Sequence, residues 1–479
     1  MVQSTGFLQN PQDGYSYLAK IEQGMSGSWT FRLPFTSQMH EGKPLFLYYL
    51  FLGHITRIFG ISSIQIFHLS RVVNASILFL CLWLTLPSFV PAKRITSAWM
   101  MTILCLGGGL GWILLPTGII PGDFWVAEAF PFLASFTNPH FPLSIACLLG
   151  MVWAWNEKSL PIRYWLIGFG AILLAIIQPF ANVVLGLVLG MDWVLGILNR
   201  ESNWKRDGLT LVIFGLTGLP YMIYSMWIVA GDPDFLNWNQ QNLTPGLTPL
   251  NWIITFSPAL ILAAIYLYQG RKQQTNQSRI FLIWMIVVII LSLLPVQWQR
   301  RFLIGLVIPL SYLGFHLVDL WLESKPKIGN LIRIAWIGLI LPSNLILITI
   351  GVLGALRKDP LLFLYRDEIA GFVWLAEHAG SNGTVLTGPD TGLYIPAFTN
   401  LGVVYGHPFE TPEAALRKAE VLGCLLAGDG DTCEKVITEQ GVDFILVGTR
   451  EVSPGWNPPR FDYPMAYQVG EVKIYEVVQ

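Results

Sequence analysis

The chain has 479 residues, of which 53% are hydrophobic and only 12% are charged, and its mean hydropathy is +0.54. So little polar surface excludes a soluble globular protein and indicates a chain that crosses a membrane many times. The net charge of −1, from 29 basic and 30 acidic residues, argues against a broad attraction to nucleic acid. Partners must therefore bind at local sites.

Residues 1–64 precede the first long apolar run, and we expect them to form an outer loop with an interfacial helix. The helix is expected at 43–60, KPLFLYYLFLGHITRIFG, which is apolar and aromatic but carries His54 and Arg57. A short membrane span is the alternative there. Residues 1–10 have neither a charged nor an apolar export signal. A first membrane helix missing from the chain as given is our hypothesis.

Ten apolar runs are long enough to cross a hydrocarbon core of about 30 Å. They lie at 65–90, 95–113, 141–156, 164–179, 181–198, 208–229, 250–268, 279–295, 302–322 and 330–353. The expected fold is therefore mainly α, with a polytopic bundle of about ten membrane helices over residues 65–353. GGGLG at 107–111 indicates close packing at a helix end rather than a phosphate loop.

Basic residues gather in the connections of one face if the ten spans alternate. They are Lys93, Arg94, Lys158, Arg163, Arg200, Lys205, Arg206, Arg271, Lys272, Arg279, Lys325, Lys327 and Arg333. The opposite connections 114–140 and 230–249 contain no Lys or Arg. The positive-inside rule then makes the first face cytoplasmic and puts both termini outside. We expect a multi-pass protein of a bacterial plasma (inner) membrane.

Residues 354–479 are less apolar and read as an extracytoplasmic α/β domain. We expect helices in RDEIAGFVWLAEHAG, PEAALRKAEVLGCLLAG and DTCEKVITEQG, and strands in GTVLTGP, VDFILVGT and EVKIYEVV. Cys424 and Cys433 would face an oxidising compartment, where a disulfide and two free thiols are both open. Nucleotide-binding and serine-hydrolase motifs are absent from the sequence.

Arg300 and Arg301 are the exception to the charge rule, because QWQRRF at 297–302 falls on the outer face. One interpretation is that they reach outer-leaflet phosphates or pair with outer carboxylates. The other is that they hold an anionic ligand, since guanidinium groups bind phosphate oxygens bidentately.

Acidic residues of the outer face supply candidates for chemistry. Asp13, Asp123 and Glu128 could act as a general base or coordinate Mg²⁺ or Mn²⁺, with Asp13 and Glu128 as the metal ligands. The alternative is that they are solvated loop charges or carboxylates at helix starts. The loop 114–140 is long and ends in TNPH, which adds Asn138 and His140 as substrate-binding candidates.

The order of these features resembles the C-type glycosyltransferase superfamily, in its branch of protein O-mannosyltransferases and lipid A aminoarabinose transferases. The likeness is carried by DGYSYLAKIEQGMSGSW, EGKPLFLYYLFLGHITRIFGIS, QWQRRFLIGLVIPL, TGPDTGLYIPAFTNLGVVYGHPFETPEAA and the closing VDFILVG and VKIYEV. It covers nearly the whole chain. Asp13 is followed by Gly14 rather than a second acid, and WWD is absent, which separates the chain from O-mannosyltransferases and oligosaccharyltransferases.

The resemblance implies a transferase that moves a hexosyl or pentosyl group from a polyprenyl-phosphate sugar to a lipid, glycan or protein hydroxyl. Asp13 would be the catalytic base or organise a metal, and Asp123 or Glu128 would match the acidic position of the second outer loop. Arg300 and Arg301 would hold the donor phosphate. His407 and Glu410, in YIPAFTNLGVVYGHPFET, would touch the acceptor or cap the site.

A lipid-linked glycan flippase or transporter without glycosyl transfer is the alternative function. His54, His68, Arg71, His316 and Asp319 lie in or near apolar runs, where ionisable groups can mark a transport pathway. No internal repeat is evident in the sequence, and transport would not require the α/β domain.

Overall fold

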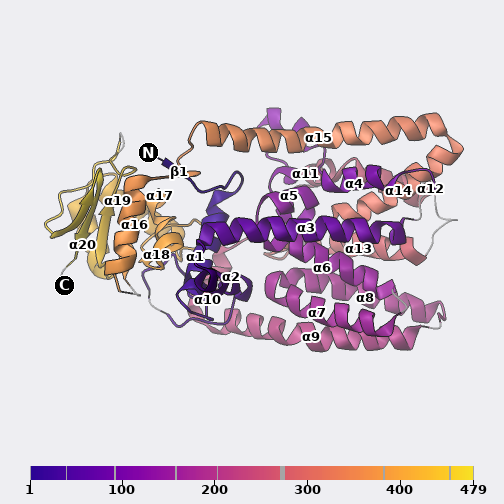
Figure 1. Cartoon of the computed structure of the whole chain (residues 1–479), viewed down its shortest axis with the longest axis horizontal. Coiled ribbons are helices and arrows are strands. Elements are labelled where there is room, and N and C mark those ends of the chain that lie inside the picture. The colour runs from indigo at the N-terminus through magenta and orange to yellow at the C-terminus, as the bar shows by residue number, and fades with distance from the viewer. Residues whose placement is uncertain are drawn as a thin grey trace. The chain divides into compact units, whose positions relative to one another are not determined.

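The computed structural model describes residues 2–38, 40–90, 93–156, 159–201, 203–269, 276–380, 383–452 and 455–477. Among the basic residues named above, Lys158, Arg271 and Lys272 lie outside this part. The chain forms two compact units (Figure 1). We call Leu69–Tyr224 with Thr244–Ile350 the helical unit. Met1–His68, Ser225–Leu243 and Gly351–Gln479 form the mixed unit.

The helical unit is built from apolar helices of very different length. Its helices are α3 (Ser63–Phe89), α4 (Ser97–Cys105), α5 (Pro131–Phe136), α6 (His140–Asn156), α7 (Leu160–Ile177), α8 (Pro179–Leu198), α9 (Trp204–Gly231), α11 (Pro249–Phe256), α12 (Ala259–Gln269), α13 (Asn276–Leu293), α14 (Val307–Ser324) and α15 (Pro326–Leu356). Short 3₁₀ helices are η1 (Gly111–Ile113), η2 (Leu115–Thr117), η3 (Gly122–Phe124), η4 (Ala127–Ala129) and η5 (Gln299–Leu303). The first four of these lie in a long connection between α4 and α5.

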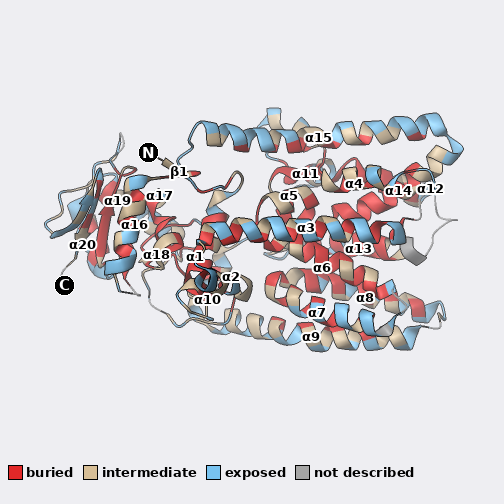
Figure 2. Cartoon of the chain, viewed as in Figure 1, coloured by how far each residue is buried: buried red, intermediate tan, exposed pale blue. Residues whose placement is uncertain are grey.

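Burial separates the central helices of this unit from the peripheral ones. The stretch from η5 through α14 is 83% buried over its most apolar window, whereas α9 is only 17% buried. Figure 2 accordingly shows α9 and α15 with many exposed residues. Because these exposed residues are largely apolar, the surface of the helical unit suits a lipid environment rather than water.

Every predicted apolar run contains helix, but the lengths differ. Five helices of the described residues are long and apolar enough to cross a membrane, or six if α11 and α12, bent by 84°, form one span. Pro161–Ile177 and Arg279–Leu293 are shorter apolar stretches. A helix of about 17 residues is only roughly 26 Å long. The structure thus supports a multi-pass membrane protein, and the number of about ten spans stays a prediction.

The predicted run 95–113 is not one helix, because α4 ends at Cys105 and a glycine-rich loop follows. A Cβ atom on Gly109 would lie 1.9 Å from the carbonyl oxygen of Thr255, and one on Gly111 would lie 1.8 Å from Oδ1 of Asp123. Only glycine permits this approach. The run GGGLG therefore serves close packing, as its composition indicated.

The mixed unit combines helices with a five-stranded sheet. Its helices are α1 (Pro11–Met25), α2 (Leu47–Phe59), α10 (Pro233–Gln241), α16 (Arg366–His378), α17 (Pro389–Gly392), α18 (Ile395–Thr399), α19 (Ala414–Leu425) and α20 (Gly430–Glu439). The sheet order is β4 (Gly402–Val403), β3 (Thr384–Leu386), β5 (Phe444–Val447), β7 (Val472–Glu476) and β6 (Met465–Val469). β3 pairs in parallel with β4 and β5, and β7 pairs antiparallel with β5 and β6.

The predicted helices and strands of residues 354–479 are present as α16, α19, α20, β3, β5 and β7. The sequence missed β6, whose residues are mostly exposed, and the two-residue β4. It also missed the pairing of β1 (Val2–Ser4) with β2 (Phe363–Tyr365), which joins the start of the chain to the segment after α15. Such pairing between distant short segments leaves no local periodicity to detect.

Helix α2 fits the segment for which an interfacial helix was expected. Its 13 residues make it about 20 Å long, too short to cross a membrane core of about 30 Å. Phe51, Ile58 and Phe59 are exposed on it, while Leu50 and Leu52 are buried. It ends at Gly60, which adopts the left-handed conformation with φ 65°.

A disulfide joins Cys424 of α19 to Cys433 of α20, which resolves the choice left open by the sequence. The two cysteines are nine positions apart and lie in the core between these helices. Closing so short a loop stabilises a domain by about 2–3 kcal/mol, mainly by restricting the unfolded chain.

We predict that the double variant Cys424→Ala, Cys433→Ala unfolds more easily than the parent, by about 2–3 kcal/mol. Denaturant titration of the purified protein, with and without a reductant, measures this. The reductant should lower the midpoint of the parent and leave that of the double variant unchanged. Two thiols that react with maleimide in the folded, unreduced parent would contradict the expectation.

Candidate functional site

Arg300 lies in η5, where the backbone is held from two sides. The backbone N–H of Arg300 donates to the carbonyl of Thr244 at 3.2 Å. Just after η5, the N–H of Gly305 donates to the carbonyl of Glu128 at 2.8 Å. Nε of Arg300 lies 3.4 Å from Oε1 of Glu128, and its guanidinium lies 5.1 Å from the ring centroid of Trp125. The structure thus brings together two of the predicted site residues, one cation and one carboxylate.

This pair is unequal in exposure. The Glu128 side chain is 4% exposed and that of Arg300 is 28% exposed. A carboxylate so buried needs a cationic partner, because an unpaired buried charge is costly. A guanidinium has five N–H donors, and a single carboxylate contact leaves others for a ligand such as phosphate.

Arg301 lies beside this pair on an aromatic cluster. Its guanidinium is 5.3 Å from the ring centroid of Phe180, the second residue of α8. Phe180 also packs on Trp298 and Phe302, with centroids 5.9 and 5.6 Å away. The cluster keeps Arg301 at the N-terminal end of α8, next to Arg300 in the same 3₁₀ helix.

Asp123 is directed into the glycine-rich loop. Its Oδ2 accepts from the N–H groups of Gly109 and Gly111 at 3.1 and 3.2 Å and from the hydroxyl of Ser343 at 2.6 Å. Burial raises the pKa of Asp123, against the effect of these hydrogen bonds. The Asp123 carboxylate therefore holds the glycine-rich loop in place. Of the two acids Asp123 and Glu128, Glu128 is the one that lies near a cation.

Asn138 lies in the turn before α6, His140 is the first residue of α6, and side chains of α3 hydrogen-bond to this turn. Nη1 of Arg71 donates to the carbonyl of Phe136 at 3.0 Å, and Nδ2 of Asn74 donates to that of Pro139 at 2.8 Å. Nδ2 of Asn138 is buried without a partner among the described residues. Arg71 and Asn74 are three positions apart in α3, which puts both on one helix face.

Asp13, His407 and Glu410 belong to the mixed unit, whereas the other predicted site residues belong to the helical unit. Asp13 lies in the first turn of α1, after Pro11, and accepts a hydrogen bond from Nδ2 of Asn10. Its side chain is half-buried, and its charge acts on His407. A first-turn carboxylate is favourable at the positive end of a helix.

Glu410 is the centre of a network that sequence analysis missed. Lys20 Nζ lies 2.9 Å from its Oε1 and 3.1 Å from its Oε2, and Ser16 Oγ donates to Oε1 at 2.5 Å. Burial works to raise the pKa of Glu410, but the charge of Lys20 and the hydrogen bonds from Ser16 and Lys20 outweigh it and hold this pKa below its usual range. The signal in the sequence was Ser16 and Lys20, one helical turn apart.

His407 is held as a neutral imidazole. Its Nδ1 accepts the N–H groups of Phe409 and Glu410 at 3.2 and 3.1 Å, which requires an unprotonated nitrogen. Burial lowers the pKa of His407, and the nearby Glu410 and Asp13 only partly oppose this. His407 and Glu410 therefore have internal structural partners.

The predicted metal ligands do not form a site within either unit. Glu128 is engaged by Arg300, and Asp13 belongs to the other unit. The described residues hold no group of three or more His, Cys, Asp or Glu side chains arranged for a metal ion. We derive no step of a reaction through a metal.

We predict that Lys20→Met destabilises the protein by about 3–5 kcal/mol, because Glu410 stays buried without its cation. Adding Glu410→Gln should recover much of this loss. Denaturant titration in detergent measures the three proteins, with Lys418→Met, an exposed lysine of α19, as the control. If the single and double variants are equally unstable, Lys20 and Glu410 do not act as a pair.

No protein-family model matches the chain, and no curated protein matches it in sequence. Solved structures do match. ArnT from Cupriavidus metallidurans in the apo state has a TM-score of 0.52 at 13% identity, covering 98% of this chain and 94% of that chain. The same protein bound to undecaprenyl phosphate matches with a TM-score of 0.52 at 11% identity over the same shares.

The Archaeoglobus fulgidus oligosaccharyltransferase, tethered to an acceptor peptide, has a TM-score of 0.53 at 12% identity. The match covers 93% of this chain and 66% of that one. At these identities the likeness concerns the fold. The chain therefore shares the fold of ArnT and of this oligosaccharyltransferase.

Proposed function

We propose that this protein is a membrane glycosyltransferase that moves a sugar from a polyprenyl-phosphate donor to a hydroxyl acceptor at the outer face. The observation that carries the proposal is the arrangement of Arg300 and Arg301 at one end of the helical unit, with the buried Glu128 beside Arg300. The fold shared with ArnT, which was crystallised with undecaprenyl phosphate, supports the donor class.

Arg300 and Arg301 would bind the donor phosphate. Their guanidinium groups occupy neighbouring positions of η5 and lie against Trp125 and Phe180, which suit the apolar surroundings of a prenyl chain. As the sugar leaves, negative charge grows on the phosphate, and fixed cations stabilise that charge. Glu128 is a positioning residue in this scheme, because it orients Arg300.

Asp13 would accept the proton of the acceptor hydroxyl. A carboxylate within reach of the attacking oxygen increases its nucleophilicity in the transition state. The half-buried position of Asp13 in α1 supports this role, since the group is neither ion-paired within the described residues nor fully enclosed. His407 and Glu410, with their internal partners, would hold the segment near Asp13 rather than bind substrate.

The outer-face orientation rests on charge and redox chemistry. The basic connections would face the cytoplasm, and the Cys424–Cys433 disulfide suits an oxidising compartment outside it. We propose accordingly a bacterial inner-membrane protein with residues 354–479 outside. The buried Asn138 amide, which lacks a described partner, would serve donor or acceptor binding together with His140.

The purified protein in nanodiscs, incubated with a polyprenyl-phosphate sugar and a hydroxyl-bearing acceptor, tests the proposal. Release of free polyprenyl phosphate together with a glycosylated acceptor supports a transferase. Movement of intact donor across a liposome bilayer without cleavage would support a flippase instead. Mass spectrometry of lipids that copurify with the protein identifies the donor class.

We predict that Arg301→Ala weakens donor binding by roughly 10- to 150-fold, because it removes a charge-assisted phosphate contact. For Arg300 the variant is Arg300→Ala with Glu128→Gln, so that no unpaired buried carboxylate remains. Equilibrium binding of a fluorescent polyprenyl phosphate measures the loss. Arg94→Ala, an exposed arginine elsewhere in the helical unit, is the control and should bind as the parent does. Unaltered binding in both site variants would remove the arginines from the donor site.

We predict that Asp13→Asn lowers turnover by about 10²- to 10⁴-fold while donor binding is retained. The amide keeps the shape and the hydrogen bond to Asn10 but cannot take a proton at neutral pH. Single-turnover transfer and donor binding are measured on the same preparation, with Asp462→Asn, an exposed acid, as the control. Normal turnover in Asp13→Asn would exclude Asp13 as the base.

A further inference from the structure

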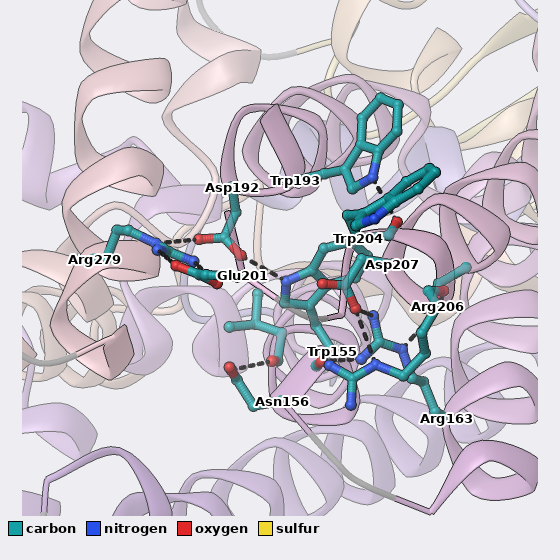
Figure 3. A network of polar contacts seen from close by, with 12 residues as sticks. Trp155, Asn156, Arg163, Asp192, Trp193, Glu201, Trp204, Arg206, Asp207 and Arg279 are labelled. Carbon is teal, nitrogen blue, oxygen red and sulfur yellow. Dashed lines mark hydrogen bonds and ion pairs between the residues drawn. The ribbon is translucent and has the colours of Figure 1, made fainter. Parts of the chain in front are cut away.

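A network of charged side chains joins several helices at one end of the helical unit (Figure 3). Arg279 of α13 donates through Nε to Asp192 of α8 at 2.8 Å and through Nη1 to Glu201 at 2.5 Å. Asp192 also accepts from the indole nitrogen of Trp155 in α6, at 2.8 Å. These contacts fix the C-terminal end of α8 against α6 and α13.

Arg163 of α7 extends this network of charged side chains to α9. Its Nη2 donates to Asp207 at 2.7 Å and its Nε to the hydroxyl of Thr210 at 2.8 Å. Arg206 donates to the same oxygen of Asp207 at 3.1 Å. One carboxylate thus serves two guanidinium groups, and the first turn of α9 keeps an excess of positive charge.

A cavity of about 500 Å³ opens at this corner between the end of α8 and the start of α9. It is lined by Trp193, Trp204, Lys205, Gly208, Leu211 and Val212. The indole N–H of Trp193 donates to the carbonyl of Trp204 at 2.8 Å, and its ring lies against Gly208, where a Cβ atom would be 3.4 Å from it. The cavity walls are therefore set by the fold and are mainly apolar.

Lys205 supplies the positive charge at the cavity. Its Nζ lies 5.4 Å from the ring centroid of Trp204, and no carboxylate of the described residues lies within 4.0 Å of it. Further along α9, an exposed apolar face is formed by Leu209, Val212 and Leu216, which are 49%, 54% and 73% exposed. Indole rings with a lysine at the end of an apolar helix are typical of the membrane–water interface.

This cavity is distinct from the arginine site. Phe180, whose ring contacts the guanidinium of Arg301, lies in the first turn of α8. Trp193 lies near the last turn of the same helix. At 1.5 Å per residue the two side chains are separated by about 20 Å along the helix. Lys205, beside Trp193, and Arg301, beside Phe180, therefore lie toward opposite ends of α8.

We propose that this cavity is a binding site for an anionic glycerophospholipid of the leaflet opposite to the arginine pair. The phosphate would lie against Lys205, and an acyl chain would follow Leu211 and Val212 onto the exposed face of α9. Charge complementarity selects an anionic headgroup, because each lysine or arginine near an anionic lipid raises the binding affinity about fivefold. The inference does not depend on the proposed transferase activity.

Native mass spectrometry of the purified, delipidated full chain tests the site. The protein is incubated with equal amounts of phosphatidylglycerol and phosphatidylcholine that carry the same acyl chains. The parent should retain phosphatidylglycerol at least about fivefold better. Lys205→Glu should reduce this retention to that of phosphatidylcholine. Equal retention of both lipids by the parent, or unchanged retention in Lys205→Glu, overturns the proposal.

Two further variants separate the site from general effects. Val212→Trp fills the cavity without changing charge, and it should lower phosphatidylglycerol retention to a similar extent while circular dichroism stays as in the parent. Lys327→Glu changes an exposed lysine of α15 outside the cavity and should retain the lipid normally. Retention lost equally in Lys327→Glu and Lys205→Glu would indicate bulk charge and overturn a defined site. Because lipid mass is the readout, failure here leaves the sugar-transfer experiment unaffected.

Discussion

The ion pair between Arg300 and Glu128 is the interaction on which the proposed donor site depends. Glu128 is buried, so its charge requires a partner, and Arg300 is the described cation that lies beside it. The pairing holds one guanidinium in place through part of its donors, and the rest remain for phosphate oxygens. Arg301 has a different support, the ring of Phe180. Two adjacent arginines are thus oriented by different means, one electrostatic and one aromatic.

The mixed unit also contains a buried carboxylate that is paired with a cation. Lys20 and Glu410 are 390 positions apart in the chain, yet their charges are buried together, within a cluster of aromatic rings around the lysine. Neither could be buried alone without a large cost. Their pairing explains why residues 1–68 pack into one compact unit with residues 351–479, although the sequence suggested a separate outer loop and a terminal domain.

Local sequence patterns predicted those parts of the structure that have local causes. Apolar runs gave the helices and the fully buried strands β3 and β5, and alternation gave β7, because burial follows the apolar residues along such segments. The neighbouring charges of Arg300 and Arg301 were also visible, since they break the charge bias of membrane loops. The spacing of Ser16 and Lys20 was the local trace of the buried network, but their partner Glu410 is set by tertiary structure alone. Asp123 was visible as an acid, but its hydrogen bonds to Gly109 and Gly111 depend on how the loop folds back.

Helix α8 connects the proposed donor site and the proposed lipid cavity of the helical unit. At its start, Phe180 packs against Arg301, and at its end Asp192 is fixed by Arg279 and Trp155. A helix held at both ends by side-chain contacts behaves as a rigid rod of about 30 Å, close to the thickness of the hydrocarbon core. Trp204 and Lys205 begin α9, directly after α8. If they hold the C-terminal end of α8 at one membrane surface, the length of α8 determines the depth of Arg301 at the other surface. A phosphate-binding arginine must lie at the headgroup level, so anchoring the far end of α8 would itself contribute to donor recognition.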